Sequence, residues 1–382
     1  MVVLGKGEGN NSVWLGSDAR SGNKVYMDFS YPIFALLVGR KRSFKSSCLR
    51  IVTEGLLDEG NGLSTGFLPK PLIFDPIGNL NLDRPNPQAS DVAALSFDNI
   101  KTLASTDGSL KVPFSSLRGE DILSVLGITE RCVLQRRTIR TILNEAGEGA
   151  SKKEFVEMAR VYAFELPNFS MDSFETKIDS LERDRAIVDD VADPLEYLKE
   201  YRGLRVDLSA LLPSDRARAD FFCNYFVNRI SEARNRARVE EIKYGLGEPA
   251  EPLLGPVCII VDELNRVSPK PFFDLIRISG NLGISVVLAS QAIRDFGSSI
   301  LGERDVTFCG KLVNRDDVRR ASTLVPVPVD FDLITEIPRL GKRNCIAWNE
   351  HDGAICNVCL REPATFHYGM DENVEKFRGL YL

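Results

Sequence analysis

The stretch IFALLVGRKRSFKSSCLRIVTEGLL, residues 33–57, decides the fold predicted for this chain. It opens with an apolar run over residues 34–38 that is typical of a buried strand. A short basic loop follows, and apolar residues then recur at helical spacing from Leu49 to Leu57. Strand, loop and helix therefore follow one another directly, which is the context that a phosphate-binding loop requires.

The loop itself fits most of the pattern G-x-x-x-x-G-K-[ST] of phosphate-binding loops. Gly39, Lys45 and Ser46 stand at the required positions, whereas Phe44 replaces the second glycine. In such a loop, backbone N–H groups hold phosphates, the lysine supplies a positive charge and the hydroxyl binds Mg²⁺. Taken alone, the segment could also be an ordinary basic turn. The predicted nucleotide-binding residues are Gly39, Arg40, Lys41, Arg42, Ser43, Phe44, Lys45, Ser46 and Ser47.

The composition is that of a globular protein and restricts the classes of function. The 382 residues are 43% hydrophobic and 27% charged, and the net charge of −6 requires any nucleic-acid contact to use local basic features. No apolar run approaches the ~20 residues of a membrane span, and the N-terminus lacks a signal-like apolar stretch. Eight cysteines, most of them among apolar neighbours, do not suggest a disulfide framework. We therefore expect a cytoplasmic protein with no membrane partner.

The pattern of elements predicts an α/β protein: a P-loop sheet with helices on both faces and an inserted all-helical subdomain. Residues 1–32 hold two strand candidates that could add a hairpin to the sheet edge. Residues 33–115 begin the core, residues 116–200 form the helical insertion, and residues 201–325 complete the core. Residues 326–382 are predicted to hold a β-hairpin and a tail. Apolar stripes at helical spacing run over residues 118–126, 133–143, 152–163 and 173–187, and short strands are predicted at 92–95, 111–114 and 205–209.

A second motif completes the predicted site. Residues 257–261 form a fully apolar strand that ends in Asp262 and Glu263, which is the Walker B form. An aspartate at this strand end can hold Mg²⁺, and the glutamate after it can act as the base that polarises the attacking water. The helical insertion explains the long separation between this motif and Lys45.

Polar residues follow three further strand candidates. Gln291 directly follows the apolar run 284–290. If this run forms a strand between the loop strand and the Walker B strand, Gln291 would lie near the terminal phosphate. The alternative is that its amide bonds only to backbone. Asp75 ends another apolar run and could face a nucleotide or be an ordinary turn aspartate. Beyond residues 306–313, the last strand of the core, the arginines that could contact phosphate are Arg315, Arg319 and Arg320.

One constellation suggests a zinc site. His351, Cys356, Cys359 and His367 include a C-x-x-C with flanking histidines. The surrounding residues, however, predict a β-hairpin, and residues three apart on a strand point to opposite faces. We therefore expect the two thiols to diverge and no zinc to bind.

The ordered set VGRKRSFKSS, LIFDPIGN, LRVDLSALL, CIIVDELNRVSP, ISGNLGISVVLASQ and LVNRDD resembles the HerA branch of the FtsK–HerA superfamily of P-loop DNA-translocase ATPases, over roughly residues 24–325. The resemblance implies an extra strand between the loop strand and the Walker B strand, and a hexameric ring with nucleotide between subunits. It also implies ATP and Mg²⁺ as ligands, and DNA and a nuclease or other effector as partners. On this resemblance, Lys45 and Ser46 hold phosphate and Mg²⁺, Asp262 holds Mg²⁺, Glu263 is the base and Gln291 is the phosphate sensor.

The chain departs from that family at three places. Phe44 replaces a loop glycine and is expected to hinder the approach of the backbone to phosphate, or to pack against a neighbouring subunit. Relatives carry a basic residue where this chain has Asn281, and Arg277, one helical turn earlier, is the candidate substitute. The N-terminal barrel of archaeal relatives is absent or reduced to residues 1–32. The alternative functions are a catalytically weak nucleotide-binding scaffold of the same fold and an ATPase for viral genome packaging or secretion.

Overall fold

The computed structural model describes residues 1–7, 11–57, 68–80, 82, 99–128, 131–147, 150–165, 171–244, 254–325 and 332–365. The strands are β1 (Val2–Leu4), β2 (Ser12–Asp18), β3 (Lys24–Asp28), β4 (Phe34–Val38), β5 (Lys70–Asp75), β6 (Ile100–Ala104), β7 (Val112–Pro113), β8 (Ile187–Val188), β9 (Gly203–Asp207), β10 (Val257–Val261), β11 (Ile284–Ser290), β12 (Val306–Cys309), β13 (Asn344–Asn349) and β14 (Ile355–Leu360). The helices are α1 (Lys45–Leu57), α2 (Gly119–Val125), α3 (Val133–Ala146), α4 (Lys152–Glu165), α5 (Met171–Arg183), α6 (Glu196–Glu200), α7 (Arg216–Tyr244), α8 (Lys270–Leu282), α9 (Ser298–Leu301), α10 (Arg315–Leu324) and α11 (Leu333–Glu336).

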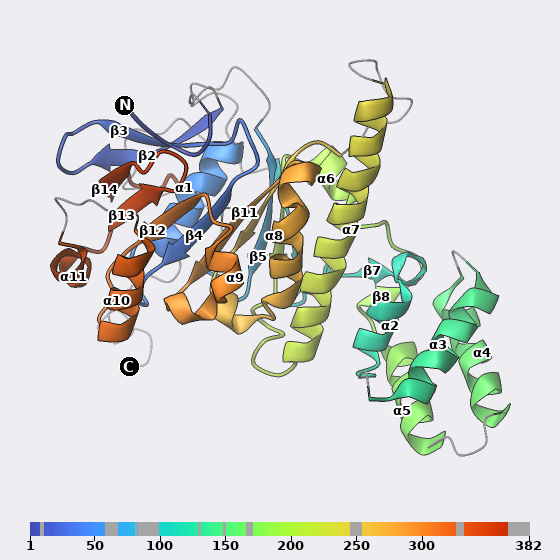
Figure 1. Ribbon diagram of the computed structural model, residues 1–382. Helices are drawn as coiled ribbons and strands as arrows, with labels where there is room; N and C mark the ends of the chain where they lie inside the picture. Colours follow the sequence, from blue (N-terminus) through green and yellow to red (C-terminus); the bar gives the residue numbers. More distant parts are fainter. Residues whose placement is uncertain are drawn as a thin grey trace, which may run out of the picture.

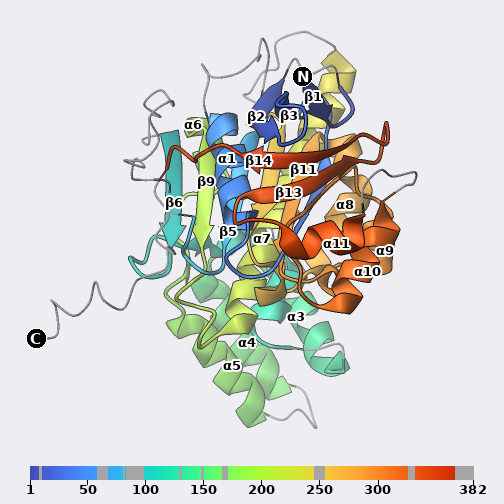
Figure 2. The same cartoon turned by 90° about the vertical axis from the view of Figure 1, so that its left-hand side faces the viewer.

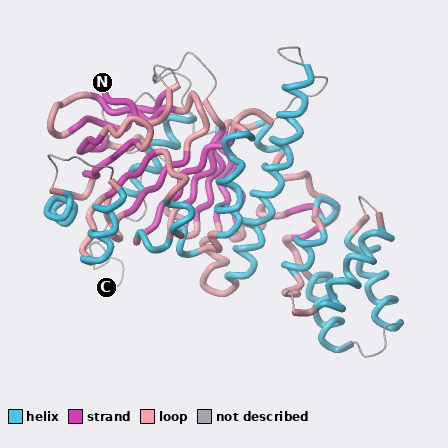
Figure 3. The backbone as a smooth tube through the Cα atoms, in the orientation of Figure 1, coloured by secondary structure: helices cyan, strands magenta, loops and turns pink. Residues whose placement is uncertain are grey.

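A twelve-stranded sheet runs through the centre of the molecule (Figures 1 and 3). Its strand order is β1-β3-β2-β14-β13-β12-β4-β11-β10-β5-β9-β6. The seven strands from β12 to β6 are all parallel, so their carboxyl ends lie at the same edge of the sheet. β11 lies between β4 and β10, as the sequence predicts. Every residue of these three strands is buried, because helices cover both faces of a parallel sheet.

Alternate side chains of each central strand enter two separate cores. Leu37 packs in a cluster with the apolar face of α1, whereas its neighbours Leu36 and Val38 pack in the cluster that includes α7 and α8. Phe74 of β5 belongs to the second cluster and makes edge contacts with aromatic rings of both helices. The sheet therefore has helices on both faces, as expected for this class of α/β protein.

The antiparallel part of the sheet combines the two ends of the described chain. β2 and β3 form the predicted N-terminal hairpin, and β13 and β14 form the predicted C-terminal one. β14 pairs with β2, and β13 pairs with β12, so both hairpins extend the parallel sheet on one side (Figure 2). The sequence did not predict β1, which pairs with β3 in parallel.

The helical insertion lies beyond α7, on the opposite side of that helix from the sheet (Figure 1). It contains the four predicted helices α2 to α5, but one of them is shorter than expected. α5 ends at Arg183 because Asp184 starts a turn, in which its carboxylate accepts the N–H of Ala186 at 2.8 Å. Ile187 then pairs with Val112 in the small parallel sheet of β7 and β8. The expectation of a helix up to residue 187 is therefore wrong.

Smaller differences concern the ends of strands. The strand predicted at 111–114 is only the two residues of β7, the strand at 205–209 begins and ends two residues earlier, and the strand at 306–313 ends at Cys309. The strand predicted at 92–95 lies outside the described residues. In the part of the chain that the structure describes, no helix combines the length and apolar character that crossing a membrane requires.

Candidate nucleotide-binding site

The predicted phosphate loop, residues 39–44, joins the end of β4 to the start of α1 at the carboxyl edge of the sheet. Backbone hydrogen bonds hold its first residues: the N–H of Gly39 donates to Ser290 O at 3.3 Å and that of Arg40 to Lys311 O at 2.9 Å. The first N–H groups of α1 have no carbonyl partner within the helix, and the helix dipole adds a positive partial charge there. This end of α1 therefore has the features of an anion-binding site.

Lys45 lies almost wholly inside this site. Its side chain is 3% exposed, and its ammonium donates to Gly39 O at 2.7 Å and to Arg40 O at 3.1 Å. The ammonium also lies 3.8 Å from Glu263 Oε1. Burial lowers the pKa of Lys45, while the carboxylates of Glu263 and Asp262 act in the opposite direction. The loop thus holds a buried cation against its own backbone.

Ser46 and Asp262 meet beside Lys45. The Ser46 hydroxyl donates to Asp262 Oδ2 at 3.2 Å, and Asp262 Oδ1 is buried with no hydrogen-bond partner. Burial, together with the nearby charges of Glu263 and Asp75, raises the pKa of Asp262 to about 7. An unpaired buried carboxylate oxygen is costly, and a hard divalent cation bound by hydroxyl and carboxylate oxygens would satisfy it. The residues therefore fit Mg²⁺.

Glu263 also lies beside Lys45, 3.8 Å from its ammonium. Its backbone has φ of +51°, a left-handed conformation that is uncommon outside glycine and that costs about 1–2 kcal/mol. The amide of Gln291 donates to Glu263 Oε2 at 2.8 Å, so this amide does not bond to backbone alone. The Asn265 amide, oriented so that its nitrogen donates, lies 3.1 Å from the same oxygen. Asn265 was not predicted, and its only sequence signal is its position two residues after Glu263.

The expectation for Phe44 is wrong. The ring is 0% exposed and packs in the core between α1 and the sheet, so it neither faces the phosphate side of the loop nor reaches another subunit. It lies against Gly39 and Gly310, where a Cβ would come within 3.3 Å and 2.2 Å of ring atoms, respectively. Among the described non-glycine residues, positive φ is confined to Arg42 and Glu263. The backbone of Phe44 therefore does not require glycine.

The outer part of the loop is strongly basic. Arg40, Lys41 and Arg42 are consecutive and exposed, which places three cations at the opening of the loop in a chain of net charge −6. Arg42 has φ of +63°, so the backbone is strained at the point where the chain turns toward α1. These charges raise the local positive potential around the site.

Asp75 is a turn aspartate, which settles the choice that the sequence leaves open. Its Oδ1 accepts the N–H groups of residues 77–79, and its Oδ2 accepts the N–H of Leu80 and the guanidinium of Arg205. Arg205 also binds Asp207 at 3.0 Å, so this buried network joins the ends of β5 and β9. Asp75 still affects the site through its charge, because it raises the pKa of Asp262.

The predicted arginines are not assembled with the site in one subunit. Arg277 is exposed on α8, and Arg315 and Arg319 are exposed on α10. No hydrogen bond or ion pair joins them to Lys45 or Asp262 within the described residues. Their role as phosphate contacts stays a prediction.

The C-x-x-C motif does not form a metal site among the described residues. Cys356 is buried and Cys359 is exposed on β14, so the two thiols lie on opposite faces, as predicted. No group of three or more His, Cys, Asp or Glu residues suited to a metal is found where the structure is described. His367 lies outside the described residues.

Solved structures share this fold at low sequence identity. VirB4 of Thermoanaerobacter pseudethanolicus aligns over 93% of this chain and 97% of its own, with 13% identity and a TM-score of 0.61. The bacterial conjugative coupling protein TrwBΔN70 aligns over 93% and 89%, with 14% identity and a TM-score of 0.62. Plasmid coupling protein TrwB in complex with ADP and Mg²⁺ aligns over 87% of each chain, with 15% identity and a TM-score of 0.57. No family model and no curated protein matches the chain. The chain therefore has the fold of the P-loop NTPases.

Proposed function

We propose that this protein is a HerA-like ATPase that binds ATP and Mg²⁺ at the loop of residues 39–44 and couples hydrolysis to movement along DNA. The observation that carries this proposal is the convergence of five side chains from three strand ends. They are Lys45, Ser46, Asp262, Glu263 and Gln291. Buried ionisable groups gathered at one edge of a sheet are typical of a functional site.

Each of these side chains has a role that its contacts support. Lys45, which donates to loop carbonyls at 2.7 Å and 3.1 Å, can turn its ammonium toward the outer phosphates of a bound nucleotide. Glu263 can accept a proton from the attacking water. Gln291, bound to Glu263, can report whether the terminal phosphate is present. Ser46 and Asp262 would hold Mg²⁺, which would supply positive charge to stabilise the phosphates.

The ring and its partners are proposed from the resemblance in sequence. The exposed arginines of α8 and α10 support an arrangement in which nucleotide lies between subunits, because they are available to a neighbouring copy. TrwB, which shares the fold, was solved with ADP and Mg²⁺. A hexamer with DNA in its channel, and a nuclease or other effector bound to it, completes the proposal. Cys48, Cys223, Cys258, Cys309 and Cys345 are thiols buried in the core, which supports a reducing cytoplasm.

The test is phosphate release from ATP with and without duplex DNA, together with ATP binding, for the wild type and Glu263→Gln. We expect DNA to stimulate the wild type. Because an amide does not accept the proton, Glu263→Gln should keep ATP binding and lose about 10²–10⁴-fold in rate. The control is Glu303→Gln, the same change at an exposed glutamate, which should hydrolyse ATP normally. A wild type that binds ATP without hydrolysing it would favour the scaffold, and hydrolysis unaffected by DNA would contradict the translocase.

A further inference from the structure

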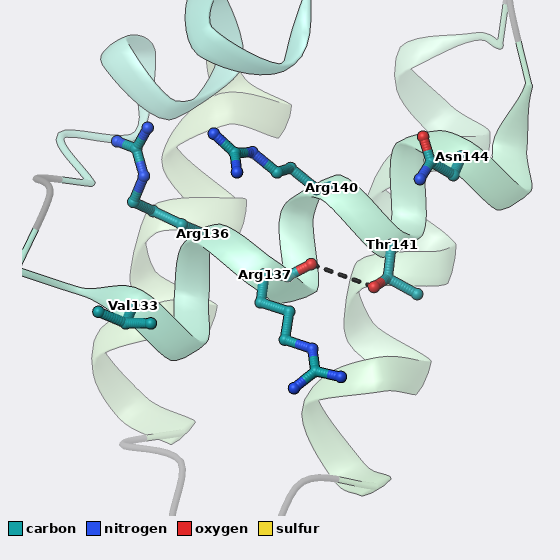
Figure 4. A pocket seen from close by; sticks show the side chains of 6 residues that line it. All are labelled: Val133, Arg136, Arg137, Arg140, Thr141 and Asn144. Carbon is teal, nitrogen blue, oxygen red and sulfur yellow. Dashed lines mark hydrogen bonds between the residues drawn. The ribbon is translucent and has the colours of Figure 1, made fainter.

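The helical insertion carries an arginine-lined pocket on α3. This open pocket of about 310 Å³ is lined by Val133, Arg136, Arg137, Arg140, Thr141 and Asn144 (Figure 4). Arg136 and Arg140 extend to one side of the helix and Arg137 to the other, so guanidinium groups flank the pocket. The insertion lies beyond α7 from the sheet that holds the phosphate loop (Figure 1), so this pocket is separate from the candidate nucleotide site.

Helical geometry places these residues on the outward face of α3. Residues four apart lie one above the other on a helix, which aligns Arg136 with Arg140, and Arg137 with Thr141. The opposite face carries Thr138, Ile139 and Ile142, which are buried within the insertion. Packing therefore fixes the rotation of α3 and turns Arg137 and Arg140 toward solvent, while Arg136 stays partly covered.

The face has more positive than negative charge. Glu120 of α2 binds Arg136 and Arg140, each at 2.8 Å, and it is 62% exposed. Arg137 is exposed and forms no ion pair with any residue that the structure describes. The side chains of the Glu120–Arg140 pair are 62% and 60% exposed, and a pair so exposed is weak, so a bound anion can compete for Arg140. Arg136, which is 20% exposed, is held by both oxygens of Glu120.

We propose that this face of α3 binds the phosphate backbone of nucleic acid. Guanidinium groups bind phosphate in a bidentate geometry, and both Arg and Asn side chains donate hydrogen bonds to phosphate oxygens in protein–DNA complexes. The Thr141 hydroxyl donates to Arg137 O at 3.1 Å, so phosphate contacts fall to the arginines and Asn144. Val133 is the single apolar residue that lines the pocket, whereas the centre of a protein interface is depleted of charge. The proposal rests on the proposed function in taking DNA as the nucleic acid.

Binding of the full chain to a labelled DNA duplex, without nucleotide and over a series of salt concentrations, tests this surface. Arg137→Ala combined with Arg140→Ala should weaken binding about tenfold or more and reduce the slope of log K against log salt by about two, since each lost phosphate contact removes about one. The matched control is Lys153→Ala combined with Arg183→Ala. It removes two exposed cations of α4 and α5 that are 82% and 77% exposed.

A change in the opposite direction gives a second test. Glu120→Gln removes the carboxylate that competes for Arg136 and Arg140 and leaves both arginines in place. It should tighten DNA binding several-fold and steepen the salt dependence. A structural role of the ion pairs alone would instead leave DNA affinity unchanged or lower it.

The outcomes separate this surface from the proposed function. If the arginine pair and its control bind DNA with equal affinity and slope, the surface is not a phosphate site. If the arginine pair loses binding to a polyglutamate peptide and keeps DNA binding, the surface belongs to an acidic protein partner and the proposal is overturned. A wild type that hydrolyses no ATP contradicts the proposed function, yet the comparison of DNA affinities still decides the role of α3.

Discussion

The ring of Phe44 fills the space that a side chain at Gly310 would need. A Cβ added at Gly310 would lie 2.2 Å from Phe44 Cδ1 and 2.6 Å from Cε1. The N–H of Gly310 donates to Val38 O at 2.8 Å, so this glycine also pairs with the last residue before the phosphate loop. Phe44 thereby anchors the far end of the loop to the ends of β4 and β12.

Gly310→Ala should disturb the loop through this contact. The new methyl group would meet a ring that is 0% exposed and surrounded by core residues, and overpacking of this kind costs about 1–3 kcal/mol. We expect a lower free energy of unfolding in urea and weaker ATP binding. The control is Gly302→Ala, where the added Cβ would lie 3.6 Å from Ser299 O with ordinary helical backbone. Equal stability and ATP affinity in the two variants would show that the ring is free to move.

Phe44→Gly should destabilise the protein rather than improve nucleotide binding. Removal of a buried phenylalanine ring leaves a cavity that costs about 3–5 kcal/mol. Glycine also loses more backbone freedom on folding than any other residue, which destabilises the folded state further. We expect the midpoint of urea unfolding to fall, with ATP affinity unchanged or weaker where the protein is folded. Phe44→Leu keeps most of the apolar volume and should lose much less stability. Tighter ATP binding by a stable Phe44→Gly variant would mean that the ring hinders phosphate after all.

The sequence predicts the elements that depend on local patterns. β4, α1, β10 and β11 follow from apolar runs and helical spacing, and polar residues at parallel strand ends meet because those ends share one edge. The direction of Phe44 could not be predicted, because the space for its ring is created by Gly310, which lies far along the chain. The pairing of β14 with β2 is likewise non-local. The sequence could not show whether Asp75 faces a nucleotide or serves a turn, because its ion-pair partner Arg205 lies far along the chain.

Lys45→Ala tests the nucleotide site directly. The variant loses the buried ammonium at the loop, and a hydrogen bond to a charged group contributes about 1.5–3 kcal/mol. We therefore expect ATP affinity to fall about 10- to 100-fold, as measured by calorimetry, and hydrolysis to fall with it. Lys41→Ala removes an exposed lysine from the same loop and should have a much smaller effect. Equal losses in both variants would indicate that the loop acts only through its overall charge.

A buried polar network fastens the segment after β14 to α1. Glu54 of α1 is 1% exposed and accepts the N–H groups of Ala364 and Thr365 at 2.9 Å and 2.8 Å. It also accepts the Thr365 hydroxyl at 2.6 Å and lies 3.2 Å from Arg361. Arg50, one turn earlier on the same helix, donates to the same hydroxyl at 2.9 Å. Since α1 begins at the phosphate loop, this network connects residues 361–365 to the helix that forms the site.

Glu54→Gln should release that segment. The amide has one acceptor oxygen where the carboxylate has two, and it removes the negative charge beside Arg50, which is 2% exposed, and Arg361, whose side chain is 12% exposed. Removing one partner of a buried ion pair typically costs about 3–5 kcal/mol. We expect a corresponding loss in urea unfolding and faster amide hydrogen exchange over residues 361–365. Glu196→Gln makes the same chemical change in an ion pair with Lys199 whose side chains are 55% and 42% exposed, and it should cost about 0–1 kcal/mol. If the two variants are equally stable and exchange at equal rates, the network does not hold the segment, and α1 depends on the apolar core alone.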